Sequence, residues 1–150
     1  MADGGEGTVD AVLAATGGER RVSTVQGPLG AEVQAARGWL NESRTAVIEM
    51  AAASGIHLVL AAERDATRAS TFGTGQLVQQ ALSAGAQRII MGFGGSATND
   101  GGTGMLRALG ARFLDSAGDE IEEGGLALKA LRQIDLNRLD ERLHKVRIEV

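Results

Sequence analysis

The sequence predicts an α/β fold in which a mixed sheet is layered against flanking helices, and three observations support that prediction. Short apolar runs that resemble buried strands alternate with segments whose apolar residues recur at helical spacing. Glycine is frequent, with 22 of 150 residues, yet it clusters between those segments, as turns and ligand-binding loops require. No internal repeat is visible, and the length suits one domain, so we expect a single α/β region over residues 1–150.

The first half of the chain is expected to supply three strands. Residues 21–25 and 31–40 alternate between apolar and polar side chains on either side of a Gly-Pro turn, which is typical of a hairpin. A third run, over residues 45–50, is almost continuously apolar. Such a run is typical of a strand that is covered on both faces.

In the second half, helical and strand-like patterns alternate. The helical patterns stop at glycines, which are common just past the last turn of a helix. The expected elements are a helix over 77–82, a strand over 88–91, a helix over 105–109, a strand over 111–114, weak helical segments over 126–131 and 139–144, and a strand over 146–150.

The segment 92–104 is the most informative part of the chain, with six glycines, three hydroxyls, one amide and one carboxylate between a strand and a helix. Glycine has no Cβ, so the backbone can turn tightly and bring its N–H groups close to a ligand. The N-terminus of the following helix adds unpaired donors and favours an anion. Asp100 could hold a divalent cation that bridges phosphate oxygens. The loop therefore indicates a site where phosphate, metal and a small acid meet.

Other interpretations of this loop are weaker. The chain contains no Walker A pattern. Gly92, Gly94 and Ala97 fit the dinucleotide-binding pattern G-x-G-x-x-A, which would make the protein an oxidoreductase that prefers NAD to ATP. That pattern would place residues 99–102 inside a helix, at about 1 kcal/mol for each glycine. A purely structural turn would need only one or two glycines.

Two further clusters carry hydroxyls or carboxylates on flexible backbone. The segment 3–8 contains Asp3 and Glu6, which suit Mg²⁺ binding or general-base chemistry, although a solvated terminal segment would have the same composition. The segment 71–76 precedes a helix, where Thr74 could bind an anion or act as the helix N-cap.

Single residues leave alternatives open. Glu49 ends an apolar strand, where a buried carboxylate needs either a ligand or a structural hydrogen bond. His57 fits a partly exposed strand or turn better than a catalytic role, because it has no partner at a metal-binding or triad spacing.

Composition excludes several classes. A formal net charge of −4 without a basic block argues against nucleic acid as a partner. No cysteine is present, so disulfides and thiolate metal sites are excluded. No apolar run reaches the roughly 18 residues that span a bilayer. Because no signal peptide opens the chain either, we expect a cytoplasmic protein without membrane partners.

Taken together, four motifs resemble the bacterial class I glycerate kinases. The matching segments are residues 1–8, 49–55, 70–75 and 94–102. The resemblance implies ATP-dependent phosphorylation of the small molecule D-glycerate, more often at the 2-hydroxyl than at the 3-hydroxyl, with Mg²⁺. It also implies two α/β domains, one embedded within the other, and these residues look like the embedded domain with its flanks.

The resemblance and the residue chemistry together give a set of expected site residues. Asp3 and Asp100 are expected to be catalytic, Asp3 as the base, and Asp100 and Glu6 are expected to bind the metal. The residues expected to bind substrate or phosphate are Gly94, Gly95, Ser96, Thr98, Asn99 and Thr74.

The family's N-terminal strand with its lysine-bearing loop and its C-terminal part have no counterpart among these residues. We therefore expect the 150-residue chain to be a fragment of a larger two-domain kinase and inactive alone. The alternative is a non-catalytic α/β domain that binds a small acid or a nucleotide.

Overall fold

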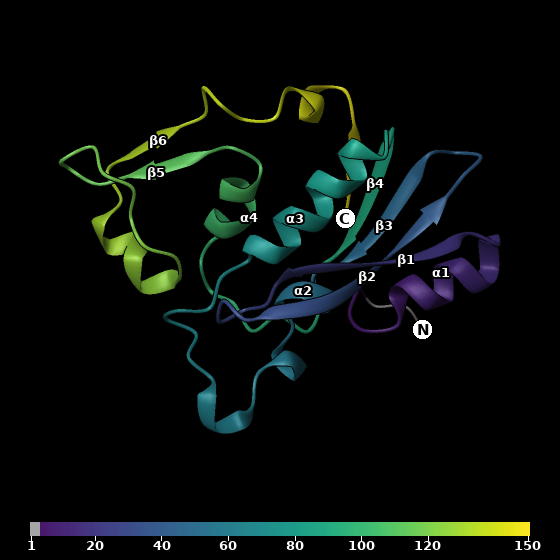
Figure 1. Cartoon of the computed structure of the whole chain (residues 1–150), viewed down its shortest axis with the longest axis horizontal. Coiled ribbons are helices and arrows are strands. Elements are labelled where there is room, and N and C mark those ends of the chain that lie inside the picture. Colours follow the sequence, from purple (N-terminus) through teal and green to yellow (C-terminus); the bar gives the residue numbers. More distant parts are fainter. Residues whose placement is uncertain (1–3) are drawn as a thin grey trace.

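The computed structural model describes residues 4–150, and Asp3 lies outside the described residues. A five-stranded sheet in the order β1-β2-β3-β4-β7 forms the body, and a separate two-stranded sheet pairs β5 with β6 (Figure 1). The helices and strands are α1 (Thr8–Thr16), β1 (Glu19–Gln26), β2 (Glu32–Leu40), β3 (Thr45–Glu49), α2 (Ala51–Ser54), α3 (Phe72–Ser83), β4 (Arg88–Gly92), α4 (Thr103–Ala108), β5 (Arg112–Leu114), β6 (Gln133–Asp135) and β7 (Arg147–Glu149). Short 3₁₀ helices are η1 (Ile56–Leu58), η2 (Ala61–Glu63), η3 (Gly125–Ala130) and η4 (Glu141–His144).

The expected hairpin is confirmed in β1 and β2. The two strands pair antiparallel from Glu19 opposite Trp39 to Gln26 opposite Glu32. The Gly27 N–H closes the turn by donating to the Ala31 carbonyl at 2.6 Å. β2 continues antiparallel into β3, so one half of the sheet is a local meander.

The other half of the sheet is parallel, because β4 pairs with β3 and β7 pairs with β4 in the same direction. All five residues of β3 are buried, which confirms the expectation of a strand covered on both faces. The carboxyl ends of β3 and β4 meet where Glu49 lies opposite Gly92. In open α/β sheets, ligands bind at this edge of the parallel strands.

Helices cover both faces of the sheet. On one face α1 packs through Leu13 close to Gly38, next to Val47. On the other face α3 buries its apolar stripe against alternate residues of the strands. That core contains Val25, Ala35, Trp39, Ala46, Ile48, Ala53, Leu77, Val78, Ala81, Leu82, Ile89, Met91 and Leu109. The α/β layering that the sequence predicts is therefore confirmed.

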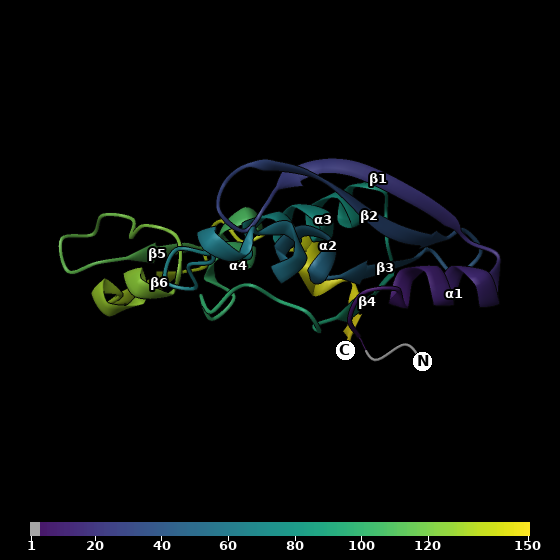
Figure 2. The same cartoon turned by 90° about the horizontal axis from the view of Figure 1, so that it is seen from below.

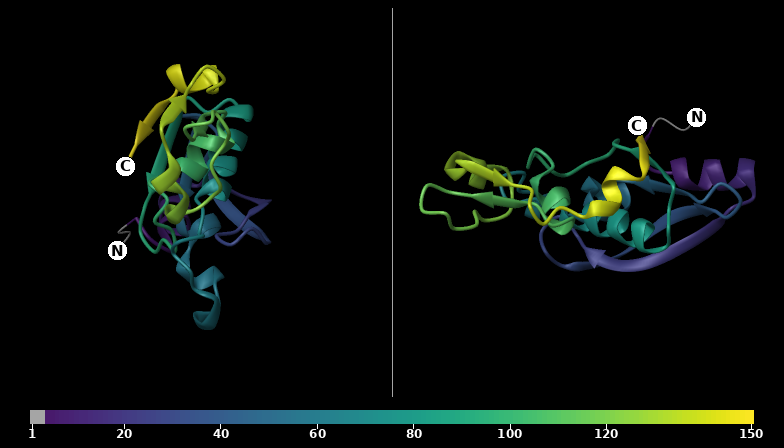
Figure 3. Two further views of the ribbon diagram at one scale, coloured as in Figure 1. Left: turned by 90° about the vertical axis from the view of Figure 1, so that its left-hand side faces the viewer. Right: turned by 90° about the horizontal axis from the view of Figure 1, so that it is seen from above.

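Two parts project from this body. The segment 55–70 between α2 and α3, called the excursion below, leaves the sheet and returns with only η1 and η2 as regular structure (Figure 1). The β5–β6 pair extends from the end of the molecule opposite α1, as Figures 2 and 3 show. The excursion starts and ends beside the carboxyl ends of β3 and β4, and this position places it next to the glycine loop.

Sequence patterns missed five elements. These are α1, α2, β6 and the 3₁₀ helices η1 and η2. α1 follows a glycine cluster that resembled a solvated terminal segment, α2 spans only Ala51–Ser54, and β6 has three residues. The weak helical segments at 126–131 and 139–144 are the short 3₁₀ helices η3 and η4.

Candidate functional site

The candidate site is the glycine loop, defined here as residues 92–104, at the carboxyl ends of β3 and β4. Its first half runs beside the start of the excursion: the Ala97 N–H donates to the Ser54 carbonyl and the Ile56 N–H to the Gly95 carbonyl, both at 2.9 Å. Gly55 and Ser96 face one another as an isolated antiparallel bridge. Backbone contacts, and not helical structure, therefore hold this half of the loop in place.

The segment that begins at Gly4 packs directly against the loop. The Gly94 N–H donates to the Gly4 carbonyl at 2.9 Å. A Cβ on Gly92 would lie 2.4 Å from that same carbonyl oxygen, so only glycine fits there. Two of the motifs identified in the sequence are thus adjacent in space, as an assembled site requires.

Gly95 carries the clearest sign of a ligand-facing backbone. Its φ of +72° is a left-handed conformation that favours glycine, and the residue is exposed. Within the described part of the chain, the N–H groups of Gly95 and Ser96 have no hydrogen-bond partner. Consecutive free N–H groups around a left-handed residue form a concave anion-binding arrangement known as a nest.

The side chains next to this nest are polar and partly accessible. The hydroxyls of Ser96 and Thr98 are 2.6 Å apart, and Ser96 Oγ also accepts from the Thr98 N–H at 3.0 Å. Both residues are half-buried, and Asn99 is exposed. These three side chains are placed where a bound ligand could reach them.

Asp100 lies in a different environment, only 1% exposed. Its Oδ2 accepts from the Thr71 N–H and the Thr71 hydroxyl at 2.8 Å each, and from the Gly104 N–H at 3.1 Å. Its Oδ1 accepts from the Gly102 N–H at 3.0 Å. The Thr71 hydroxyl in turn accepts from the Met105 N–H at 2.8 Å. This hydrogen-bond network joins the start of α3 to the start of α4.

The donors around Asp100 bear on its expected roles. Four donors from the chain itself surround the carboxylate. Three of them bond to Oδ2, so no coordination position is left open at that oxygen. The expectation that Asp100 binds a cation and acts in catalysis stays a prediction, and the geometry favours an architectural role.

Thr74 is also internal. It is fully buried in α3, and its hydroxyl is 2.7 Å from the equally buried Ser54 hydroxyl. The pair ties α3 to the end of α2. The predicted ligand contact of Thr74 stays untested, but its hydroxyl does not face an open surface.

The two carboxylates near the N-terminus have partners within the chain. Oε1 of Glu49, which is 8% exposed, accepts from the Val9 N–H in the first turn of α1. Of the two alternatives for Glu49, the structure thus provides the structural hydrogen bond. Glu6 pairs with His57 Nδ1 at 2.8 Å on a largely exposed surface. Glu6 and His57 line a cavity of about 320 Å³ together with Asp10 and Arg20.

The described residues do not fit a resident Mg²⁺ site. No group of three or more His, Asp or Glu side chains within residues 4–150 is arranged to hold a metal ion. Glu6 is engaged by His57, and Asp100 by its four donors. Ligands from outside this range would be needed to complete a cation site.

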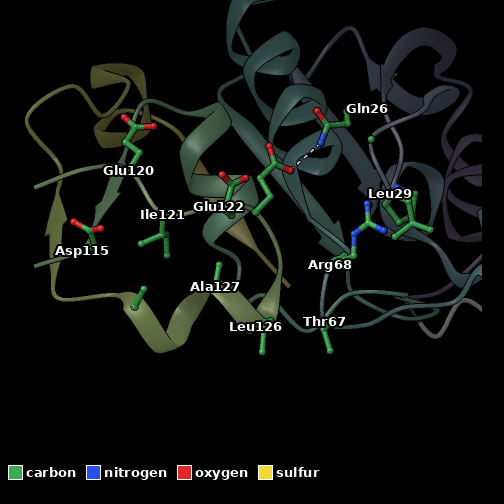
Figure 4. Close-up of a pocket in the computed structure, with 14 residues that line it drawn as sticks. Gln26, Leu29, Thr67, Arg68, Asp115, Glu120, Ile121, Glu122, Leu126 and Ala127 are labelled. Atoms are coloured by element: carbon green, nitrogen blue, oxygen red, sulfur yellow. Dashed lines mark hydrogen bonds between the residues drawn. The ribbon is translucent and has the colours of Figure 1, made fainter. Parts of the chain in front are cut away.

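A cavity of about 780 Å³ lies between the β1–β2 turn, the excursion and the segment 115–130, and no residue of the glycine loop lines it (Figure 4). Gln26 Nε2 donates across it to Glu123 at 2.9 Å. Its walls are acidic, and Arg68 lies beside Leu29 on the opposite side from Asp115 and Glu120. None of the residues expected to form the site lines this cavity.

Sequence reasoning missed several residues that build the site. Ser54 and Thr71 provide the buried hydroxyls that organise the loop, and a hydroxyl inside an otherwise apolar or glycine-rich motif is the signal that could have identified them.

The geometry defines an α/β protein with a glycine-rich loop at the carboxyl ends of parallel strands. α4 begins only at Thr103, so residues 99–102 are not helical and the dinucleotide-binding interpretation fails. The model of the glycerate kinase family matches residues 1–150. The chain therefore belongs to the glycerate kinase family.

Individual relatives agree with this assignment. The chain is 55% identical over all 150 residues to the glycerate kinase of Bacillus subtilis and 53% identical to the glycerate 2-kinase of Escherichia coli, in each case covering 39% of that protein. A crystal structure of a protein described as a glycerate kinase 2 from Salmonella typhimurium LT2 superposes with a TM-score of 0.95, at 51% identity, over 99% of this chain and 40% of that one. The chain thus spans about two fifths of the length of these relatives. None of the helices within residues 4–150 is long and apolar enough to cross a membrane.

Proposed function

We propose that these residues belong to a glycerate kinase that transfers the γ-phosphoryl group of ATP to D-glycerate. The observation that carries the proposal is the match of the whole chain to one family of kinases, with relatives above 50% identity. The 2-hydroxyl is the favoured acceptor, because the relative from Escherichia coli is named a glycerate 2-kinase. The cytoplasm is the proposed location, and no nucleic-acid partner is proposed for a chain of net charge −4.

The reaction breaks the bond between the γ-phosphorus and the oxygen that bridges it to the β-phosphate, and it forms a bond from that phosphorus to the glycerate oxygen. The hydroxyl proton passes to a base, for which Asp3 is our candidate, and ADP leaves with the bridging oxygen. Such transfers depend mainly on positioning and charge stabilisation, with little covalent chemistry for the protein to perform.

The glycine loop supplies groups of the required kind. The free N–H groups of Gly95 and Ser96 are the donors that we assign to the anionic oxygens of the reacting group. The hydroxyls of Ser96 and Thr98 and the amide of Asn99 are assigned to the hydroxyls of the substrate. Gly94 contributes position only, because its N–H is already bonded to Gly4.

ATP-dependent kinases generally use Mg²⁺ to neutralise phosphate charge, and we propose it for this enzyme too. Because residues 4–150 do not form a cation site, ligands from outside this range would have to hold the metal. The competing function is a non-catalytic domain that binds a small acid or a nucleotide, which the short span of the chain relative to its relatives keeps open.

The deciding experiment measures ADP formation with D-glycerate, ATP and Mg²⁺ in an enzyme of the relatives' length that carries these residues, beside the 150-residue chain alone. We expect turnover in the range of about 1–10³ s⁻¹ for the former and none for the latter. Phosphorus NMR of the product distinguishes the 2-phosphate from the 3-phosphate. A protein that is stabilised against heat by ATP or glycerate but releases no ADP would support the binding domain instead.

A further inference from the structure

We propose that Arg64 binds the carboxylate of the hydroxy-acid substrate, in a small cavity between the excursion and the glycine loop. This inference rests on the proposed function, because it names the residue that selects an acid as the acceptor.

The cavity has the size of a three-carbon acid. It measures about 190 Å³ and is lined by Leu29, Ile56, Val59, Arg64, Asp65, Ala66, Ala69 and Ala97. A water molecule takes about 30 Å³ of liquid, so this volume equals roughly six waters, which suits the seven heavy atoms of glycerate and not a nucleotide. Ala97 directly follows the Gly95–Ser96 nest, so the cavity begins beside the candidate phosphoryl site.

Arg64 is the free positive charge of this cavity. Among residues 4–150 it makes no hydrogen bond and no ion pair. Apart from Asp65, the other walls of the cavity are apolar, so Arg64 is the cationic group in its lining. Guanidinium groups match carboxylates in a bidentate geometry, which gives directional recognition as well as charge.

The neighbouring carboxylate, that of Asp65, forms no ion pair with Arg64. Asp65 Oδ1 accepts from the Thr67 N–H at 3.0 Å and from the Thr67 hydroxyl at 2.5 Å. These bonds, the hydroxyl first, hold the pKa of Asp65 below its ordinary value, with a smaller contribution from the charge of Arg68. Asp65 is therefore held as an anion by Thr67 and Arg68 and forms no ion pair with Arg64, so the Arg64 guanidinium keeps its donors available for a carboxylate.

The other cavities do not suit an acid. The 780 Å³ cavity is lined by Asp115, Glu120, Glu122 and Glu123, with Arg68 as its one cation. The 320 Å³ cavity is lined by Glu6, Asp10 and Glu49, and its Arg20 is paired with Asp10 at 3.4 Å. Of these three cavities, the Arg64 cavity is the one that combines an unpaired cation with contact to the glycine loop.

The test replaces Arg64 in an enzyme of the relatives' length and uses Arg68 as the matched control, because Arg68 is a second exposed arginine of the excursion that faces a different cavity. We expect Arg64→Gln to raise the KM for D-glycerate about 10- to 100-fold, the loss typical of a charged hydrogen bond, with the KM for ATP unchanged. Arg64→Lys should restore part of the affinity. The KM of Arg68→Gln for D-glycerate should stay within about twofold of the wild-type value. The melting temperature should be the same in all variants.

Two outcomes would overturn the proposal: an unchanged KM for D-glycerate in Arg64→Gln, or a loss that appears in the KM for ATP or equally in Arg68→Gln. A wild-type enzyme that does not phosphorylate D-glycerate would refute the proposed function but not this inference. In that case calorimetric titration with D-glycerate, lactate and propionate decides it. Saturable binding that Arg64→Gln abolishes supports the carboxylate site, and absent or equal binding rejects it.

Discussion

Two parts of the candidate site, the hydrogen-bond network around Asp100 and the excursion, are built in opposite ways. Asp100 is 1% exposed, and the described chain provides four donors to its carboxylate. The excursion has little regular structure and carries Arg64 and Arg68, whose guanidinium groups make no hydrogen bond or ion pair within residues 4–150. A saturated charge fixes the shape of a site, whereas an unsaturated charge is available to a ligand. The most distinctive residue of the loop is therefore the one least able to touch a substrate.

The sharpest test of this difference is Asp100→Asn, with the largest expected effect. The amide would direct an NH₂ group at donors that now bond to a carboxylate oxygen, so we expect a loss of about 2–4 kcal/mol in the free energy of unfolding. For a chain of this size, that loss lowers the melting temperature by roughly 5–15 °C.

Asp115→Asn is the matched control for that variant, because Asp115 also accepts two backbone N–H groups in a turn but is less buried. Asp115→Asn should lower the free energy of unfolding by much less than Asp100→Asn does. Equal melting temperatures for wild type and Asp100→Asn, together with a changed Mg²⁺ requirement in the longer enzyme, would restore the cation-binding role.

Gly95→Val should affect the nest more than the fold. The side chain would be forced to adopt a φ of +72°, which costs about 1–3 kcal/mol, and it would also cover the free N–H groups. Affinity for ATP and D-glycerate is measured beside the melting temperature.

Gly118→Val serves as the control, since it imposes a similar strain at φ +85° in a turn with open space around it. If both variants lose the same stability and neither loses affinity, Gly95 is only a structural turn.

Thr74→Val tests whether the buried hydroxyl pair belongs to the architecture. The substitution leaves the Ser54 hydroxyl buried without a partner, at a cost of about 1–2 kcal/mol. The double variant Ser54→Ala/Thr74→Val should recover part of this loss, because it removes both partners. Unfolding by urea measures Thr74→Val, Ser54→Ala and the double variant, and strictly additive losses would argue against a coupled pair.

The smallest effect is expected at Thr67. Thr67→Val removes the hydroxyl bond that lowers the pKa of Asp65, so that pKa should rise toward its ordinary value. Because the folded-state pKa is depressed, the bond stabilises the protein above the unfolded pKa and is lost as the pH falls through the folded one. Wild type and variant should therefore converge in stability at low pH.

Carbon NMR titration of the Asp65 carboxyl measures the shift. Thr24→Val, another exposed threonine, is the control and should leave that titration where it is.

The sequence predicted the sheet and the loop well because both depend on local patterns. The hairpin at 21–40 and the strand at 88–91 follow from alternation and apolar runs, and the glycine loop follows from composition. The roles inside the loop could not be predicted, since they depend on partners distant in the chain. Asp100 finds Thr71 twenty-nine positions away, and the nest borders an excursion that no motif marks. Whether a polar side chain is available to a ligand or supports the fold depends on its burial. The spacing of residues in the sequence does not predict that burial.

The parallel pairing of β3 with β4 sets an order of assembly for the molecule. The β1–β2 hairpin closes between positions 26 and 32, and hairpins form in about 1–10 μs. The first β3–β4 pair joins positions 45 and 88, so the excursion and α3 must be looped out before it forms. That closure costs more chain entropy and is intrinsically slower. The strand ends and the excursion that hold the glycine loop come together only with this step, so we expect the loop to be among the last parts of the chain to take shape.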